Sequence, residues 1–205
     1  MLPGTYTKNL AGLSSNTLTA ALDRVDQMNI PSVTTDLWEL VGSQTFTSQG
    51  ISCNFAIDAG KNYKTLYMVY WFQANTAPTT SGILFTFNND AGASAYARGT
   101  YFYSYAYAAG APGIITSGST GAAGFISSNN PALANAIGYG SATFSIANNA
   151  YKHCHSIFTT ERSTPVTEFG QLYTRYSNTS TAISSIQFFS NSGTYTGYIK
   201  LYGMK

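Results

Sequence analysis

From residue 38 onward, the chain is a succession of short apolar runs separated by turn-forming residues. The runs are rich in Ile, Val, Phe and Tyr, and Gly, Asn, Ser and Pro punctuate them. This pattern predicts β-strands, and many such strands with almost no helical periodicity between them predict a β-sandwich or barrel. In 183–189 the apolar face changes partway along the run, which suggests a β-bulge. We expect strands at 38–41, 51–57, 66–73, 83–87, 142–146, 153–160, 169–176, 183–189 and 195–202.

One helix is predicted before the first strand, over 17–28. Its apolar residues recur at spacings of three and four, and Pro31 follows it. A helix of this length needs a surface on which to bury its apolar face, because short helices are marginal in water. Two interpretations stay open: the helix lies against the sandwich, or it belongs to an arm that docks on a neighbouring subunit. The residues that would anchor such an arm are Leu18, Leu22 and Val25.

The predicted organisation is an N-terminal arm, 1–37, followed by one β-sandwich domain, 38–205. Within the sandwich, residues 108–141 interrupt the strand pattern and are rich in Gly, Ala, Ser and Asn. We expect a long loop or an excursion from the sandwich there. Long loops in compact domains are often functional or lie against a partner.

The chain carries few charges for a soluble protein. Charged residues make up 9 % of the sequence, whereas about 25 % is typical. A surface built from Ser, Thr, Asn, Gln and Gly gives little electrostatic repulsion between copies, which suits a protein held in an assembly. The ten Lys and Arg residues are scattered singly, so we do not expect nucleic-acid binding. The longest apolar run, 66–72, is too short for a membrane span, and the N-terminus shows no signal peptide.

The sequence His153–Cys154–His155 is the strongest metal-site candidate. On a strand the two histidines point to one face, as zinc ligands could. No acidic residue is close in the sequence and Cys154 points the other way. The favoured interpretation is therefore a core thiol between two surface or interface histidines. We predict that both Cys53 and Cys154 are buried and unpaired.

The sequence Asn88–Asn89–Asp90 offers oxygen ligands for calcium, but it lacks the DxDxDG pattern of a calcium loop. A turn stabilised by local side-chain hydrogen bonds is favoured instead. Motifs for a serine nucleophile and for a phosphate-binding loop do not occur. Glu161 and Glu168 lie near Arg162, which does not amount to a glycosidase acid pair. We therefore predict no catalytic residue, no metal and no cofactor, and a function that is not enzymatic.

An unusual aromatic run occupies 101–107. If it is a strand, four tyrosines share one face, and they form either a wall of the sandwich or a contact surface. Tyrosine suits contact surfaces because it combines a large area with a polar tip. Both interpretations stay open. The four residues are Tyr101, Tyr103, Tyr105 and Tyr107.

A weak internal repeat suggests two similar halves. Residues 55–57 and 63–64 read Phe-Ala-Ile and Tyr-Lys, and residues 144–146 and 151–152 read Phe-Ser-Ile and Tyr-Lys. The aromatic strands 84–87 and 186–189 then close the two halves. Two Greek-key halves are how a jelly roll is made.

Three stretches together resemble a known family. They are Trp-Glu-Leu-Val at 38–41 with 55–57 and 63–66, Leu-Phe-Thr-Phe-Asn-Asn-Asp at 84–90 with Tyr96, and 183–189 leading into 197–203. In this order and spacing they resemble a jelly-roll domain of tailed-bacteriophage virion proteins, which include capsid decoration proteins, head fibres and tail or baseplate attachments. The resemblance covers about 38–107 and 141–205. It does not extend to the first 37 residues, where we expect the attachment mode.

The resemblance implies an all-β protein: a jelly-roll β-sandwich with a short N-terminal helical arm. The implied function is a non-enzymatic structural protein on the virion surface, of capsid decoration or head-fibre type. A receptor-binding module of the tail or baseplate that binds carbohydrate is the alternative. Exposed aromatic rings flanked by Asn and Asp would favour this alternative, and a buried tyrosine face would favour the structural role. The expected partners are other copies in a homotrimer, the major capsid protein or another virion protein, and, for the alternative, a host surface glycan. We expect no membrane insertion. We expect the protein to be assembled into the virion in the host cytoplasm.

Overall fold

The computed structural model describes residues 38–205 except 77–81, 93–94, 107–112, 128–133 and 164–165, and it does not describe the side chains of 98–120, 162–166 and 168. The chain divides into two units, Met1–Leu37 and Trp38–Lys205. The first unit lies outside the described residues, and with it lie the helix predicted over 17–28 and the proposed anchors Leu18, Leu22 and Val25.

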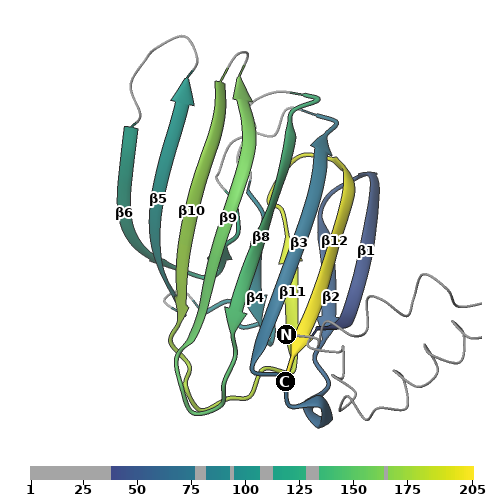
Figure 1. Ribbon diagram of the computed structural model, residues 1–205, viewed down its shortest axis with the longest axis vertical. Helices are drawn as coiled ribbons and strands as arrows, with labels where there is room; N and C mark the ends of the chain where they lie inside the picture. Colours follow the sequence, from purple (N-terminus) through teal and green to yellow (C-terminus); the bar gives the residue numbers. More distant parts are fainter. Residues whose placement is uncertain (1–37, 77–81, 93–94, 107–112, 128–133, 164–165) are drawn as a thin grey trace, which may run out of the picture. The chain divides into compact units, whose positions relative to one another are not determined.

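The described residues form two antiparallel sheets that face each other (Figure 1). The larger sheet has eight strands in the order β1-β12-β3-β8-β9-β10-β5-β6, and the smaller has four in the order β2-β11-β4-β7. The elements are β1 (Glu39–Gln49), β2 (Ser52–Ala56), the 3₁₀ turn η2 (Ala59–Lys61), β3 (Thr65–Ala74), β4 (Leu84–Phe87), β5 (Tyr96–Ala106), β6 (Gly113–Gly121), β7 (Gly124–Phe125), β8 (Ile137–Ser145), β9 (Lys152–Ser163), β10 (Val166–Tyr176), β11 (Ser185–Phe189) and β12 (Tyr195–Met204).

The strand order is that of a jelly roll with two added hairpins. When the hairpins β5–β6 and β9–β10 are set aside, eight strands remain in chain order. One sheet then holds the first, eighth, third and sixth of them, and the other holds the second, seventh, fourth and fifth. This is the interleaved order of two Greek keys, so the predicted jelly-roll β-sandwich is confirmed. Both added hairpins extend the larger sheet beyond β8 (Figure 1).

The internal repeat agrees in part with this order. Residues 55–57 lie at the end of β2 and residues 144–146 at the end of β8, which are the second and sixth strands of the jelly roll. These positions are equivalent when the fold is divided into two halves of four strands. Strands β4 and β11 are the fourth and seventh, which are not equivalent, so the second pair of matching stretches does not mark a repeat.

Two local predictions differ from the structure. Where the sequence predicts a loop or excursion over 108–141, the structure has β6, β7 and the first half of β8. Gly and Ser weaken strands, but β6 pairs with β5 through nine consecutive residue pairs. The bulge predicted in 183–189 is wrong. β11 begins at Ser185 and keeps a continuous register with both of its neighbours, and Ile183 is buried just before the strand starts.

The core is aromatic and lies between the sheets. Along β3, alternate residues from Leu66 to Ala74 are buried, as a strand with one face in the core requires. Phe144 on β8 of the larger sheet meets three rings of the smaller sheet. Its ring centroid lies 5.1 Å from that of Phe85 and 6.0 Å from those of Phe87 and Phe188. These contacts join the two layers.

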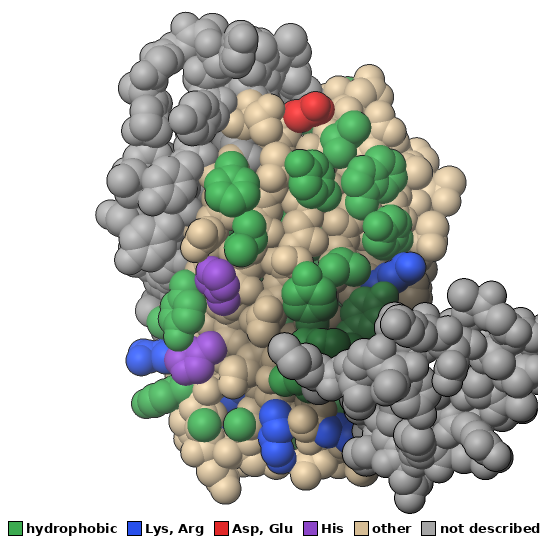
Figure 2. All heavy atoms as spheres, in the orientation of Figure 1, with side chains coloured by type: hydrophobic (Ala, Val, Ile, Leu, Met, Phe, Trp, Pro, Cys, Tyr) green, Lys and Arg blue, Asp and Glu red, His purple; other side chains and the backbone are tan. Residues whose placement is uncertain are grey.

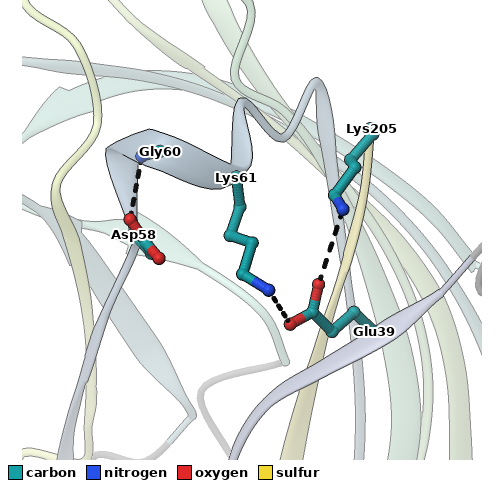
Figure 3. Close-up of polar contacts among 5 residues, drawn as sticks. All are labelled: Glu39, Asp58, Gly60, Lys61 and Lys205. Atoms are coloured by element: carbon teal, nitrogen blue, oxygen red, sulfur yellow. Dashed lines mark hydrogen bonds and ion pairs between the residues drawn. The ribbon is translucent and has the colours of Figure 1, made fainter.

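An ionic cluster ties the start of β1 to its neighbours (Figure 3). Glu39 accepts a hydrogen bond from Lys61 of η2 at 2.8 Å, and Lys205, beyond β12, lies 4.0 Å away. The hydrogen bond from Lys61 lowers the pKa of Glu39, and the same contact raises the pKa of Lys61. Asp58 caps η2 by accepting from the backbone N–H of Gly60 at 2.8 Å. Because the cluster faces solvent, it contributes little to stability.

Candidate binding surface

The two histidines beside Cys154 do not form a metal site with other described residues. Cys154 on β9 is buried in the core, where burial raises the pKa of its thiol. Its neighbours His153 and His155 lie on the outer face; His153 shares a hydrogen bond with the Tyr173 hydroxyl, and His155 Nε2 lies 3.3 Å from Gln171 Oε1. No group of three or more metal-ligating side chains occurs among the described residues. Cys53 is likewise a buried free thiol, so the prediction for both cysteines is confirmed.

Residues 88–90 form a turn, as the sequence predicted. Asn88 and Asn89 have left-handed backbone conformations, with φ of 52° and 55°, which asparagine tolerates better than most residues. Asn88 Oδ1 accepts from the backbone N–H groups of Ser184 and Ser185. Asp90 accepts from the N–H of Gly92 at 3.0 Å and from the Tyr176 hydroxyl at 2.6 Å. The carboxylate of this sequence is therefore already used to hold the turn against β10.

Replacing Tyr176 with phenylalanine should lower the free energy of unfolding by about 2 kcal/mol at pH 7, the value of a hydrogen bond to a charged group. The hydrogen bond from Tyr176, followed by that from Gly92, lowers the pKa of Asp90. A carboxylate with a lowered folded-state pKa contributes stability above its unfolded pKa and loses it as the pH falls through the folded value. The difference between wild type and Tyr176→Phe should therefore shrink in acid. Urea unfolding at pH 7 and at about pH 2.5 measures it. The exposed Tyr139→Phe is the control, and an equal loss at both pH values would contradict the role of Asp90.

The outer face of the larger sheet carries three rows of side chains that cross five neighbouring strands. The pairing registers place them, since directly paired residues lie side by side and alternate residues share a face. From β12 through β3, β8 and β9 to β10, the first row is Tyr198, Trp71, Tyr139, Thr159 and Phe169. The middle row is Lys200, Val69, Ser141, Ile157 and Gln171, and the last row is Tyr202, Tyr67, Thr143, His155 and Tyr173.

Large rings on this face are open to solvent. Tyr139 is 51 % exposed, Phe169 43 % and Tyr198 39 %, although such residues usually bury most of their area. Figure 2 shows this face, with hydrophobic side chains spread over it and only isolated charged ones. Isolated exposed apolar residues are ordinary, but a contiguous set marks a site of interaction.

The side chains at the centre of the middle row are short, because Val69 pairs with Ser141 there. A shallow hollow of about 480 Å³ lies there, lined among others by Trp71, Tyr139 and Tyr198 of the first row and by Tyr67 of the last. A second hollow of about 430 Å³ shares Tyr67 and Val69 with it, and its other described lining residues are Trp38 and Tyr202. The rings of Trp38 and Tyr67 lie 5.6 Å apart. The two hollows form one trough across the strands, which we call the aromatic trough.

The tyrosine run singled out in the sequence is only partly described. Tyr101, Tyr103 and Tyr105 belong to β5, where they pair with Gln171, Phe169 and Thr167 of β10. Tyr107 lies outside the described residues, as do the side chains of the other three. The choice between contact surface and sheet packing therefore stays a prediction for these four residues.

Sequence reasoning missed the residues of the aromatic trough. Trp71 and Tyr198 lie in runs that were predicted as strands, in which aromatic residues occur on both faces. Such a strand does not reveal which of its faces is covered. The sequence did contain one indication of this face: along β3, the residues Tyr67, Val69 and Trp71 alternate with the residues that are buried in the core. Glu161, two residues beyond Thr159 of the first row on β9, accepts from the backbone N–H of Ile137 at 3.1 Å and so has a structural contact.

The fold and this face together define a jelly-roll sandwich with an extended, aromatic outer sheet. The chain matches no protein-family model, no curated protein and no solved structure. Within the described part of the chain, no helix has the length and apolar character needed to cross a membrane.

Proposed function

We propose that this chain is a non-enzymatic structural protein of the bacteriophage virion surface, of capsid decoration or head-fibre type. The observation that carries the proposal is the jelly-roll strand order, widened by two hairpins into an eight-stranded sheet with an aromatic outer face. Jelly rolls occur in viral capsid proteins and in lectins. Because a fold does not choose between such roles, the sequence resemblance supplies the phage assignment.

The acidic residues described in detail support a role without catalysis. Glu39 pairs with Lys61, Asp58 caps η2, Asp90 holds a turn, and Glu161 binds the backbone of β8. A general acid or base needs a carboxyl group free to exchange a proton with a substrate. Each of these carboxylates instead has a structural partner.

The proposal retains residues 1–37 as the attachment arm and a homotrimer as the assembled state. The low charge of the chain supports close association of copies. A trimer follows from the family resemblance, since phage capsids offer threefold positions to proteins of this kind. The major capsid protein is the proposed partner of the arm.

Antibodies against the chain should label the heads of intact particles, purified from lysates of cells in which the protein is made. The full chain, purified alone, should scatter light with the mass of a trimer. Particles lacking the protein, produced from a deletion of its coding sequence, are the control for the label. Particles without the chain in their protein content would overturn the virion proposal, and a monomeric mass would overturn the trimer.

A second candidate is a carbohydrate-binding module of the tail or baseplate. The exposed rings of Tyr139, Tyr198 and Phe169 favour it, while the described polar side chains that line the hollow beside them include Ser141 and Thr159 and no Asn or Asp. Labelling at the tail instead of the head would select this candidate.

A further inference from the structure

We propose that the aromatic trough binds a neutral polysaccharide chain that lies across the strands of the larger sheet. The inference rests on the proposed function in one respect only, which is that the chain would encounter the polysaccharide on the surface of a phage particle. The site itself follows from the side chains of β12, β3, β8, β9 and β10.

The shape of the trough fits an extended polymer. The first row crosses five strands, and at about 4.8 Å between neighbouring strands this is a length of about 19 Å. The two hollows adjoin through Tyr67 and Val69, so the depression is elongated. Rings border it on both sides, with Trp71 and Tyr139 in the first row and Tyr67 in the last. Several sugar rings in succession can lie in such a space.

The chemistry of the walls fits the two faces of a sugar ring. A pyranose ring has patches of C–H groups, which carry a slight positive charge, and an aromatic face carries the complementary negative charge. The rings of Trp71 and Tyr139 supply these faces at paired positions on adjacent strands, while the ring of Tyr198 has the Lys200 ammonium over it at 5.5 Å. Because the backbone that carries these side chains is held by a paired sheet, ligand binding costs side-chain entropy but little backbone entropy.

The polar groups around the rings fit hydroxyls. Ser141 and Thr159 line the hollow, and Thr143 and Gln171 lie at its borders in the same rows. Hydroxyl and amide groups can both donate and accept, as sugar hydroxyls do. Among the described residues, the lining of the two hollows includes no Lys, Arg, Asp or Glu, and the one charged residue in the three rows is Lys200, whose Nζ lies 5.5 Å from the centroid of the Tyr198 ring. Apart from Lys200, a charged polymer would find no complementary charge among the described residues of the trough, so a neutral glycan is the ligand class that this surface matches.

The binding test uses the full chain and an array of neutral and charged glycans, followed by titration of the neutral glycan that binds best. We expect Trp71→Ala and Tyr139→Ala each to weaken binding about tenfold, the change that corresponds to losing one aromatic contact. Trp71→Phe should retain more affinity than Trp71→Ala. The matched control is Tyr151→Ala, because Tyr151 is 48 % exposed but lies outside the three rows.

Fluorescence gives a second readout. The chain has two tryptophans, Trp38 and Trp71, which both line the trough, so the emission of Trp71 is taken as the difference between the emission of the wild type and that of Trp71→Phe. Binding of the glycan should shift this emission to the blue, because a sugar ring over Trp71 excludes water. Thermal unfolding of each variant checks that it folds. If Trp71→Ala does not fold, the separate variants Tyr139→Ala and Trp71→Phe still test the inference.

Three outcomes would overturn the inference: no binding to any neutral glycan of the array, binding to charged glycans alone, or self-association of the chain that Trp71→Ala abolishes. The last would assign the trough to a second copy of the chain. The result is separable from the virion proposal. A chain found in particles that binds no glycan overturns only the inference, and a chain that binds glycans but is absent from particles overturns only the virion role.

Discussion

Replacing Phe144 with alanine should lower the free energy of unfolding by about 3–5 kcal/mol, the usual cost of removing a buried phenylalanine ring. Phe144 has no solvent exposure. Its ring reaches from the larger sheet into a set of edge-to-face and tilted contacts with Phe85, Phe87 and Phe188 of the smaller sheet. Truncation would leave a cavity between the two layers, and rings held on paired strands can collapse into it only in part. The lost contacts are those that join the sheets.

Urea unfolding measured by far-ultraviolet circular dichroism tests this expectation. The matched control is Phe169→Ala, because Phe169 is on the same sheet but 43 % exposed on the outer face. Its loss should change stability by less than about 1 kcal/mol, since an exposed ring gains little from folding. A cost for Phe144→Ala no larger than that of the control would show that the two sheets do not depend on this ring.

Replacing Gly197 with alanine should destabilise the protein by about 3 kcal/mol or more, at the upper end of the cost of overpacking. Gly197 lies on β12 between β1 and β3, opposite Phe46 and Phe72. A Cβ atom at this position would lie 2.1 Å from the carbonyl oxygen of Trp71 and 2.6 Å from the Cα of Phe72. Both atoms belong to the backbone of a strand in the middle of the sheet, so they can move only if the pairing of β12 with β3 is disturbed.

The measurement is again urea unfolding, with the yield of soluble protein as a second readout. Gly50→Ala is the control, because the nearest atom to its added Cβ would be the Gly193 carbonyl oxygen at 3.9 Å, an ordinary contact distance. We expect Gly50→Ala to change stability by less than about 0.5 kcal/mol. If both variants unfold at the same urea concentration, a Cβ atom at position 197 does not meet the backbone of β3. Gly197 precedes Tyr198, so a shift of β12 would also displace one ring of the aromatic trough.

Local sequence patterns predicted most strands because a strand with one covered face has a period of two residues. The buried residues of β3 and β12 alternate strictly, and both strands were predicted. The pattern was less informative for β6, whose Gly- and Ser-rich sequence resembles a loop. Its strand conformation depends on hydrogen bonds with β5, and these bonds are the same for any side chain.

The candidate site was harder to predict than the fold. The run of tyrosines at 101–107 could be recognised as a candidate contact surface because its members are close in the sequence. The residues of the trough are far apart in the chain, with Trp71, Tyr139 and Tyr198 each on a different strand. Trp71 and Tyr198 are ordinary strand residues when taken alone, and Tyr139 lies in the segment 108–141 that was predicted as a loop or excursion. Their significance arises from the registers that place them side by side.

The sequence by itself determined that the described part of the chain is all-β, that Cys53 and Cys154 are core thiols, and that 88–90 is a turn. These properties follow from the local periodicity, polarity and backbone preferences of a few neighbouring residues. Only the tertiary structure decided that β12 lies between β1 and β3, that two hairpins widen one sheet, and which aromatic residues face solvent. The physical reason is that strand pairing is made by backbone hydrogen bonds between residues far apart in the chain, and these bonds carry no local signature of the partner.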